Sequence, residues 1–213
     1  MSTCRLCLKP IAIPGERWNE PLFESPNFVA VPSLGALVEG WVLLVPKPHV
    51  ISFGALTKDL FPEMLAMKDA ITAGLMQQYG PICIFEHGPS RERCRVGCGV
   101  DHAHLHFVPI EFDLRSAAAP FLPEDLIWSP AVIQDCQWAF FNEKDYLYVE
   151  QPLGRGSIAM SQAYGSQIFR RAIAKEIGRP DEFNWREYSH IENVTATARS
   201  FMHLWKTNTE VVA

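Results

Sequence analysis

Three histidines alternate with apolar residues in one short segment, His102-Ala103-His104-Leu105-His106, and this spacing constrains the fold more than any other feature. In an extended strand, residues two positions apart point to the same face of a sheet. The pattern therefore predicts three imidazoles on one face and apolar side chains on the other. Neighbouring histidines would lie roughly 7 Å apart, and the outer pair about twice that. Because one metal ion cannot easily reach both outer rings, we expect a shared reactive surface and not a three-histidine cage.

The composition is that of an ordinary globular chain: 213 residues, of which 48% are hydrophobic and 20% are charged. This length suits one large domain, or a domain plus a long extension. The net charge of −5 argues against a nucleic-acid partner. The start, MSTCRLCLKP, lacks the apolar core of a secretory signal, and no stretch is long enough to span a membrane. We therefore expect a cytoplasmic protein whose six cysteines are mostly buried or metal-bound.

Apolar periodicity predicts an α+β fold with an antiparallel sheet. Expected strands lie at 28–31, 41–45, 81–85, 102–109, 138–141 and 146–149. Expected helices lie at about 59–79, 162–176 and 194–205. The composition of the sequence changes after Asp113, where a connection rich in alanine and proline follows. We therefore expect two parts, a first domain at 1–113 and an α+β extension at 114–213 that packs on it.

The histidine segment and its surroundings resemble the histidine-triad (HIT) superfamily, whose signature is His-φ-His-φ-His-φ-φ with φ an apolar residue. Residues 102–108 match this signature completely. Upstream, residues 40–50 are similar to the family's glycine, buried strand and proline-basic-histidine turn, and residues 85–88 fall where the family has a turn. The resemblance covers about residues 1–113. It implies a HIT-like antiparallel sheet with flanking helices.

The resemblance implies a nucleotide hydrolase or nucleotidyl transferase that acts at the α-phosphate of a nucleotide ester, anhydride or phosphoramidate. His104 would be the nucleophile and would form a covalent nucleotidyl-histidine intermediate. A neutral imidazole is available for this step because its unperturbed pKa is about 6.5. His106 would support charge on the phosphate, and His102 would orient its neighbour. The residues expected to contact the nucleotide or its phosphates are Gly97, Cys98, Gly99, His87 and Trp41.

Cys4 and Cys7 form a Cys-x-x-Cys pair, which is half of a typical zinc site. Resemblance to the zinc-bearing bacterial branch of the HIT superfamily implies that His49 and His102 complete the site. A closed set of four ligands suits a structural zinc. Such an ion would hold the N-terminal segment and His102, and would thereby support the reactive histidines. The alternative is a pair of loose thiols in a frayed terminus.

Some positions depart from individual HIT branches. Trp41 stands where some HIT hydrolases have a histidine, which weakens assignment to the dinucleoside-polyphosphate branch. Ala103 and His106 stand where galactose-1-phosphate uridylyltransferase has proline and glutamine, which favours hydrolysis over hexose-phosphate uridylyl transfer. Two rival interpretations stay open. One is a non-catalytic nucleotide- or protein-binding module that retains the pocket, and the other is a zinc hydrolase with its metal on His104 and His106.

The C-terminal half carries weaker signals. Residues 167–175 and the sequence Asn184-Trp185-Arg186 resemble the extension of CwfJ-like HIT relatives. Arg170 or Arg171 is expected either to reach the substrate phosphate or to lie in solvent on the outer face of a helix. The extension would also cover the surface through which smaller HIT proteins dimerise, so monomer and homodimer both stay open.

Overall fold

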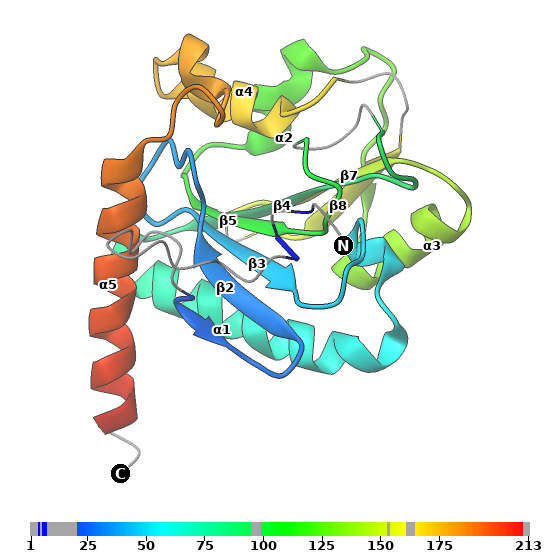
Figure 1. The fold of residues 1–213 in the computed structure, drawn as a ribbon. Coiled ribbons are helices and arrows are strands. Elements are labelled where there is room, and N and C mark those ends of the chain that lie inside the picture. The colour runs from blue at the N-terminus through cyan, green and yellow to red at the C-terminus, as the bar shows by residue number, and fades with distance from the viewer. Residues whose placement is uncertain are drawn as a thin grey trace.

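In the computed structural model, the described residues form one antiparallel sheet of eight strands, in the order β1-β2-β3-β5-β4-β7-β8-β6 (Figure 1). The structure describes residues 4, 6–7, 21–94, 99–152, 154–160 and 165–210, with side chains described up to residue 201. The strands are β1 (Phe23–Glu24), β2 (Phe28–Pro32), β3 (Val42–Pro46), β4 (Ile82–Gly88), β5 (Leu105–Pro109), β6 (Ser129–Pro130), β7 (Tyr146–Glu150) and β8 (Gly156–Met160). The α-helices are α1 (Phe61–Tyr79), α2 (Leu114–Ala118), α3 (Cys136–Phe141), α4 (Ile168–Glu176) and α5 (Ile191–Glu210). The predicted antiparallel sheet with flanking helices is therefore confirmed.

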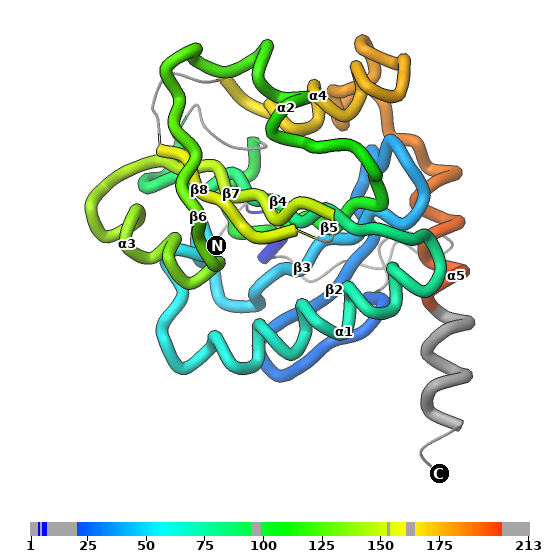
Figure 2. Tube along the Cα trace, turned by 180° about the vertical axis from the view of Figure 1, so that it is seen from behind, coloured from blue at the N-terminus to red at the C-terminus, as the bar shows by residue number. Residues whose placement is uncertain are grey.

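Helices cover both faces of the sheet. Helix α1 crosses one face, as Figure 2 shows from behind, and α2 and α4 lie on the other. Alternate strand residues pack into two hydrophobic clusters, one with α1 and the other with α4. Phe107 faces α1 and is fully buried. Burying one such side chain contributes about 1.5–3 kcal/mol, so the two clusters fix which face each strand residue takes.

The histidine segment keeps its predicted alternation but not its predicted strand length. Strand β5 starts at Leu105, so His106 is the one histidine of the three within the strand. Ala103, Leu105 and Phe107 all pack on the α1 side, as expected. Before the strand, the N–H of Ala103 donates to the carbonyl of Val50 at 2.7 Å. The chain thus leaves the ladder early, which frees the preceding histidines from the regular spacing of a strand.

The region of residues 138–141 was predicted as a strand and forms helix α3 instead (Cys136–Phe141). Cys136 and Ala139, three positions apart, are buried, whereas Trp138 and Phe141 are 60% and 70% exposed. Buried residues three positions apart are typical of a helix. In a run as short as 138–141, the apolar pattern of the sequence does not distinguish a helix from a strand. Helix α4 starts at Ile168, later than predicted, and residues 161–164 of the expected helix lie outside the described residues.

Residues after 113 continue the same sheet. Strand β7 pairs with β4 over five positions, from Ile84↔Glu150 to Gly88↔Tyr146, and β8 pairs with β7 in turn. The division between residues 113 and 114 remains a prediction. The C-terminal half contributes strands β7 and β8 to the sheet, and its helix α4 covers the face that carries His106. Among the described helices, none has the length and apolar content that crossing a membrane requires.

Glu86 is a buried carboxyl group on the α1 side of β4. It accepts hydrogen bonds from the N–H of Phe53 at 2.7 Å and from the hydroxyl of Tyr146 at 2.6 Å. Burial raises the pKa of Glu86 to about 7, and the two hydrogen bonds offset this only in part. Glu86 therefore joins the short turn Phe53–Ala55 to β7 and changes its charge close to neutral pH.

We expect the stabilising contribution of Glu86 to fall as the pH rises. In the unfolded chain its carboxyl loses the proton near pH 4.5, whereas in the fold it keeps the proton up to about pH 7. The difference in unfolding free energy between wild type and Glu86→Gln should therefore fall by about 2–3 kcal/mol from pH 5 to pH 8. Urea denaturation of both proteins over this pH range measures it.

The comparison with Glu86→Gln is needed because the buried histidines change the unfolding free energy with pH in the opposite direction. Burial lowers the pKa of His87 to about 3 and that of His104 to about 4, so these rings cost stability as the pH falls below about 6.5. The histidines are present in both proteins, so their contribution cancels in the difference between wild type and Glu86→Gln. A difference that stays constant with pH would contradict the assignment to Glu86.

Candidate active site and metal centre

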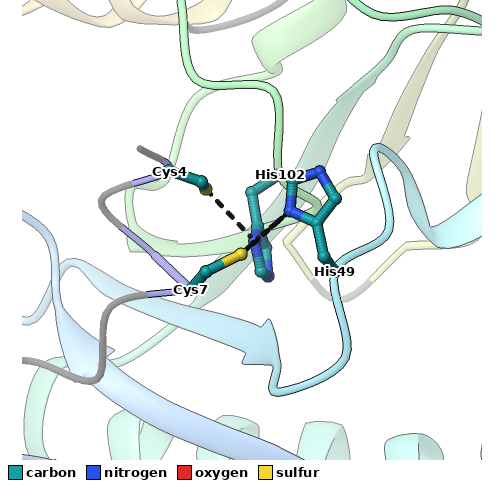
Figure 3. Close-up of side chains that lie close together, drawn as sticks. All are labelled: Cys4, Cys7, His49 and His102. Carbon is teal, nitrogen blue, oxygen red and sulfur yellow. Dashed lines mark hydrogen bonds between the residues drawn. The ribbon is translucent and has the colours of Figure 1, made fainter. Parts of the chain in front are cut away.

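Four predicted ligands meet at one point: Cys4, Cys7, His49 and His102 (Figure 3). The Nδ1 atom of His102 lies 3.5 Å from Sγ of Cys4, 3.4 Å from Sγ of Cys7 and 3.3 Å from Nδ1 of His49. Sγ of Cys7 lies 2.9 Å from Nδ1 of His49. A tetrahedral zinc ion, with bonds of about 2.0–2.1 Å to nitrogen and 2.3 Å to sulfur, separates its ligand atoms by roughly 3.3–3.8 Å. All but the shortest of these separations fall within or near that range, so the four residues can bind a metal.

The backbone directs His102 into this cluster. Its Nε2 atom lies 2.8 Å from the carbonyl oxygen of Pro46, the last residue of β3. A carbonyl oxygen only accepts, so Nε2 carries the proton and the lone pair of Nδ1 faces Cys4 and Cys7. A second ring nitrogen held by a carbonyl is the usual arrangement of a metal-binding histidine. The proline that ends β3 thus sets the orientation of the ligand.

His104 is half-buried, and the same argument determines its tautomer. Its Nδ1 atom lies 2.6 Å from the backbone oxygen of His102, so Nδ1 donates and Nε2 keeps a lone pair. Burial lowers the pKa of His104 to about 4, while the hydrogen bond to His102 acts against this shift. The ring therefore offers a neutral nucleophilic nitrogen, oriented by the backbone of a candidate metal ligand.

His106 has the complementary tautomer. The indole N–H of Trp41 donates to Nδ1 of His106 at 3.0 Å, and an indole nitrogen is a donor only. In the neutral ring the proton must therefore be on Nε2. The ring is stacked on Phe85, with centroids 4.4 Å apart, and its centroid lies 4.9 Å from that of His104. Burial lowers the pKa of His106 well below its ordinary value. His106 therefore lies beside the nucleophile as a neutral N–H donor.

His87 and Trp41, both predicted to contact the nucleotide, lie near these rings. His87 is buried, and its ring centroid lies 4.8 Å from that of Phe169 on α4 and 5.9 Å from that of Phe85. Trp41 has no exposed surface. The contact of Trp41 with the nucleotide stays a prediction. Trp41 contacts His106 from inside the core.

The predicted phosphate loop is described only in part. Gly97 and Cys98 lie outside the described residues. Gly99 has a φ of 77°, in the left-handed region that glycine favours, and its carbonyl accepts a hydrogen bond from the guanidinium of Arg186 at 2.8 Å. The guanidinium of Arg186 also lies 4.7 Å from the ring centroid of Trp185. The Trp-Arg pair of the C-terminal half thus reaches the loop that precedes the histidines.

Arg170 does not lie in solvent on the outer face of α4, which was one of the two positions expected from the sequence. It is 2% exposed, and its guanidinium lies 4.8 Å from the ring centroid of Trp41. The guanidinium donates to the backbone carbonyls of Gly35 and Phe183. Arg171 lies over the Phe183 ring at 3.9 Å. No local signal distinguishes the two arginines, because a charged residue on a helix is ordinarily exposed.

Comparison with solved structures returned partial matches. A hypothetical histidine triad nucleotide-binding protein from Sulfolobus tokodaii is 20% identical over 44% of this chain and 62% of its own length, with a TM-score of 0.36. A HIT family hydrolase from Clostridium thermocellum is 14% identical over 52% of this chain and 92% of its own, with a TM-score of 0.37. Yeast Ap4A phosphorylase in complex with AMP is 15% identical over 72% of this chain and 63% of its own, with a TM-score of 0.44.

Two of these three solved structures are described as a histidine triad protein or a HIT family protein. All three matches are partial and of low identity, between 14% and 20%. The chain spans less than two thirds of the length of the first of them. No family model and no curated protein matches the sequence.

Proposed function

We propose that this chain is a HIT-type nucleotide hydrolase or nucleotidyl transferase with His104 as its nucleophile. The observation that carries the proposal is the pair of opposite tautomers on adjacent rings. Nδ1 of His104 donates to the backbone of His102, which leaves the lone pair on Nε2. Trp41 donates to Nδ1 of His106, which leaves a proton on Nε2. One ring is thus prepared to attack phosphorus and its neighbour to donate to a phosphoryl oxygen.

The reaction has two displacements. Nε2 of His104 attacks the α-phosphorus of a nucleotide ester, anhydride or phosphoramidate, and the bond from phosphorus to the leaving group breaks. The leaving group keeps the bonding electron pair and takes a proton from solvent. Water, or an acceptor phosphate, then attacks the same phosphorus, the N–P bond breaks, and Nε2 regains its lone pair. Splitting the transfer in this way replaces one difficult step by two easier ones.

His106 would stabilise the charge that develops on the phosphoryl oxygens. Its Nε2–H belongs to a ring held by Trp41 and stacked on Phe85, so the donor is oriented before the reaction starts. Donors oriented in advance need no reorganisation during the reaction and contribute most where water is excluded. His106 is 3% exposed, which meets that condition. Gly97, Cys98, Gly99 and His87 remain our proposed phosphate contacts.

We also propose that Cys4, Cys7, His49 and His102 hold a structural zinc ion. Two thiolates and two imidazoles form a closed tetrahedral set, which leaves no open position for substrate. Bound zinc would supply a fixed link between the N-terminal segment and His102, whose carbonyl in turn orients His104. Thiolate ligands must stay reduced, which suits the cytoplasmic location that we propose.

The rival zinc hydrolase, with metal on His104 and His106, receives less support. The indole N–H of Trp41 occupies Nδ1 of His106 and leaves the proton of the neutral ring on Nε2, so His106 offers no lone pair to a metal ion. Within the described ranges, the residues grouped closely enough to hold a metal are Cys4, Cys7, His49 and His102, and neither His104 nor His106 joins them. The non-catalytic binding module keeps the same pocket and is separated from the enzyme by experiment.

Mass spectrometry of the trapped intermediate tests the proposal. The protein is mixed with nucleoside phosphoramidates, AMP esters and dinucleoside polyphosphates, and quenched without acid because an N–P bond is acid-labile. We expect one added nucleotidyl group, on the peptide that contains His104. Turnover without an adduct, and preserved in His104→Ala, would contradict covalent catalysis. Tight nucleotide binding without turnover of any substrate would favour the binding module.

A further inference from the structure

Arg170 places a positive charge inside the core, behind the reactive histidines. It belongs to α4, in the C-terminal half, and is 2% exposed. Its Nε donates to the carbonyl of Phe183 at 2.8 Å, and its Nη2 donates to the carbonyl of Gly35. Holding a guanidinium away from water is costly unless its donors are satisfied, and these two carbonyls hold the charge in one place.

Trp41 connects this charge to the active site. The guanidinium of Arg170 lies 4.8 Å from the ring centroid of Trp41, which is within the range of a cation–π interaction. The edge of the same indole donates to Nδ1 of His106 at 3.0 Å. Phe85 packs against Trp41 edge-on, with centroids 6.0 Å apart, and stacks on His106. Arg170, Trp41 and His106 therefore form a continuous buried series from α4 to β5.

We propose that Arg170 is a positioning residue for the reaction of His104, and that it acts through Trp41 to hold His106 as a neutral ring with its proton on Nε2. This inference rests on the proposed function. Protonating His106 would place a second N–H against the indole N–H of Trp41, and two donors cannot pair. The fixed charge of Arg170 opposes protonation further. Helix α4 would thereby complete a site whose reacting groups lie in the N-terminal half.

Electrostatics at neighbouring rings agree with this arrangement. Burial contributes most to the lowered pKa of His106, followed by the charges of His104, His87 and Arg170. For His87 the order is burial, then His104, then Arg170. The field of Arg170 thus reaches both rings. Since Arg170 donates to backbone carbonyls, its charge is oriented by the fold and does not depend on a bound substrate.

Three variants test the series, with one control on the same helix. Arg170→Met removes the charge, Arg170→Lys keeps it, and Trp41→Phe removes the N–H but keeps an aromatic ring. Lys175→Met is the control, since Lys175 is an exposed cation on the same helix that lies over Phe121 and not over Trp41. We expect Arg170→Met to lower kcat by about 10- to 100-fold with little change in KM, the size typical of groups that orient a reacting ligand. Arg170→Lys should recover most of this loss, and Lys175→Met should match wild type.

Two readouts separate positioning from a merely structural role. In the Trp41→Phe background, Arg170→Met should lower kcat no further, because the N–H through which it acts is already absent. In a ¹H–¹⁵N spectrum, the indole N–H resonance of Trp41 should move upfield in Arg170→Met and stay in place in Lys175→Met. Absence of that resonance in Trp41→Phe assigns it among the six tryptophans.

The outcomes are decisive in either direction. An unchanged kcat in Arg170→Met, an unmoved Trp41 resonance, or a full additional loss in the Trp41→Phe background would each overturn the proposal. If Arg170→Met does not fold, Trp41→Phe carries the test, and its unchanged kcat would overturn it. The resonance of Trp41 is measured without substrate, so it tests the contacts between Arg170, Trp41 and His106 even if wild type turns over no nucleotide. A wild type without turnover would contradict the proposed function and not these contacts.

Discussion

Replacing His104 with alanine is expected to reduce turnover of nucleoside phosphoramidates and AMP esters by at least about 10³-fold while the protein keeps its fold. Losing the nucleophile removes the covalent route, and only binding and the remaining donors can still accelerate the reaction. The decrease should appear in kcat and not in KM, because the lone pair of Nε2 forms its bond to phosphorus only during the reaction.

The fold should tolerate this change because His104 lies on the side of the segment away from the α1 core. The neighbours that pack against α1 are Ala103 and Leu105, and both remain in the variant. The side chain of His104 donates a hydrogen bond from Nδ1 to the backbone oxygen of His102. Its loss should cost no more than an ordinary hydrogen bond, about 1 kcal/mol. Circular dichroism and thermal unfolding should therefore resemble those of wild type.

Two controls accompany the His104 experiment. His190→Ala removes a histidine that contacts Glu182 and Glu192 just before α5, and it should leave turnover unchanged. Free imidazole added to His104→Ala should restore part of the activity by occupying the space of the missing ring. Full activity of His104→Ala in the absence of imidazole would exclude His104 as the nucleophile.

Removing the metal is expected to have the largest effect on stability. Cys4→Ser together with Cys7→Ser should abolish binding of about one zinc ion per chain. A ligand that binds only the folded state at 1,000 times its Kd stabilises that state by about 4 kcal/mol, and this contribution should be lost. Turnover should also fall by about 10- to 100-fold, because His102 would no longer be held and its carbonyl orients His104.

Zinc content by elemental mass spectrometry and thermal unfolding with and without chelator measure these effects. Cys94→Ser makes the same chemical change in a half-buried thiol that donates to Asp145, and a hydroxyl can replace that donor. It should retain zinc and stability. A stable wild type without zinc, and indifferent to chelator, would contradict the structural site. If a chelator abolished turnover while the protein stayed folded and equally stable without zinc, the rival zinc hydrolase would gain support.

The sequence predicted those parts of the site that depend on local geometry. Alternation of histidines with Ala103 and Leu105 follows from the period of an extended chain, and the structure places these apolar neighbours in the core as expected. The Cys-x-x-Cys pair and His49 indicated a four-ligand site, and the four side chains do lie together. Helix α1 was equally predictable, because its apolar spacing and its Gly80 stop are signals within one segment.

Other features depended on partners that lie far away in the chain. Residues 138–141 form a helix because their surroundings bury Cys136 and Ala139. An apolar pattern of four residues does not reveal those surroundings. The sequence alone did not reveal that β7 pairs with β4. Long-range pairing is selected by the packing of the whole sheet and not by the strand itself.

By itself, then, the sequence determined which residue types could carry phosphoryl transfer and bind a metal, because those signals are motifs with short, regular spacing. Only the tertiary structure decided the tautomers of His104 and His106, the buried position of Trp41 and the place of Arg170 behind it. A tautomer is set by whichever donor or acceptor reaches the other ring nitrogen. For His106 that donor is Trp41, 65 residues away, and only folding brings the two together.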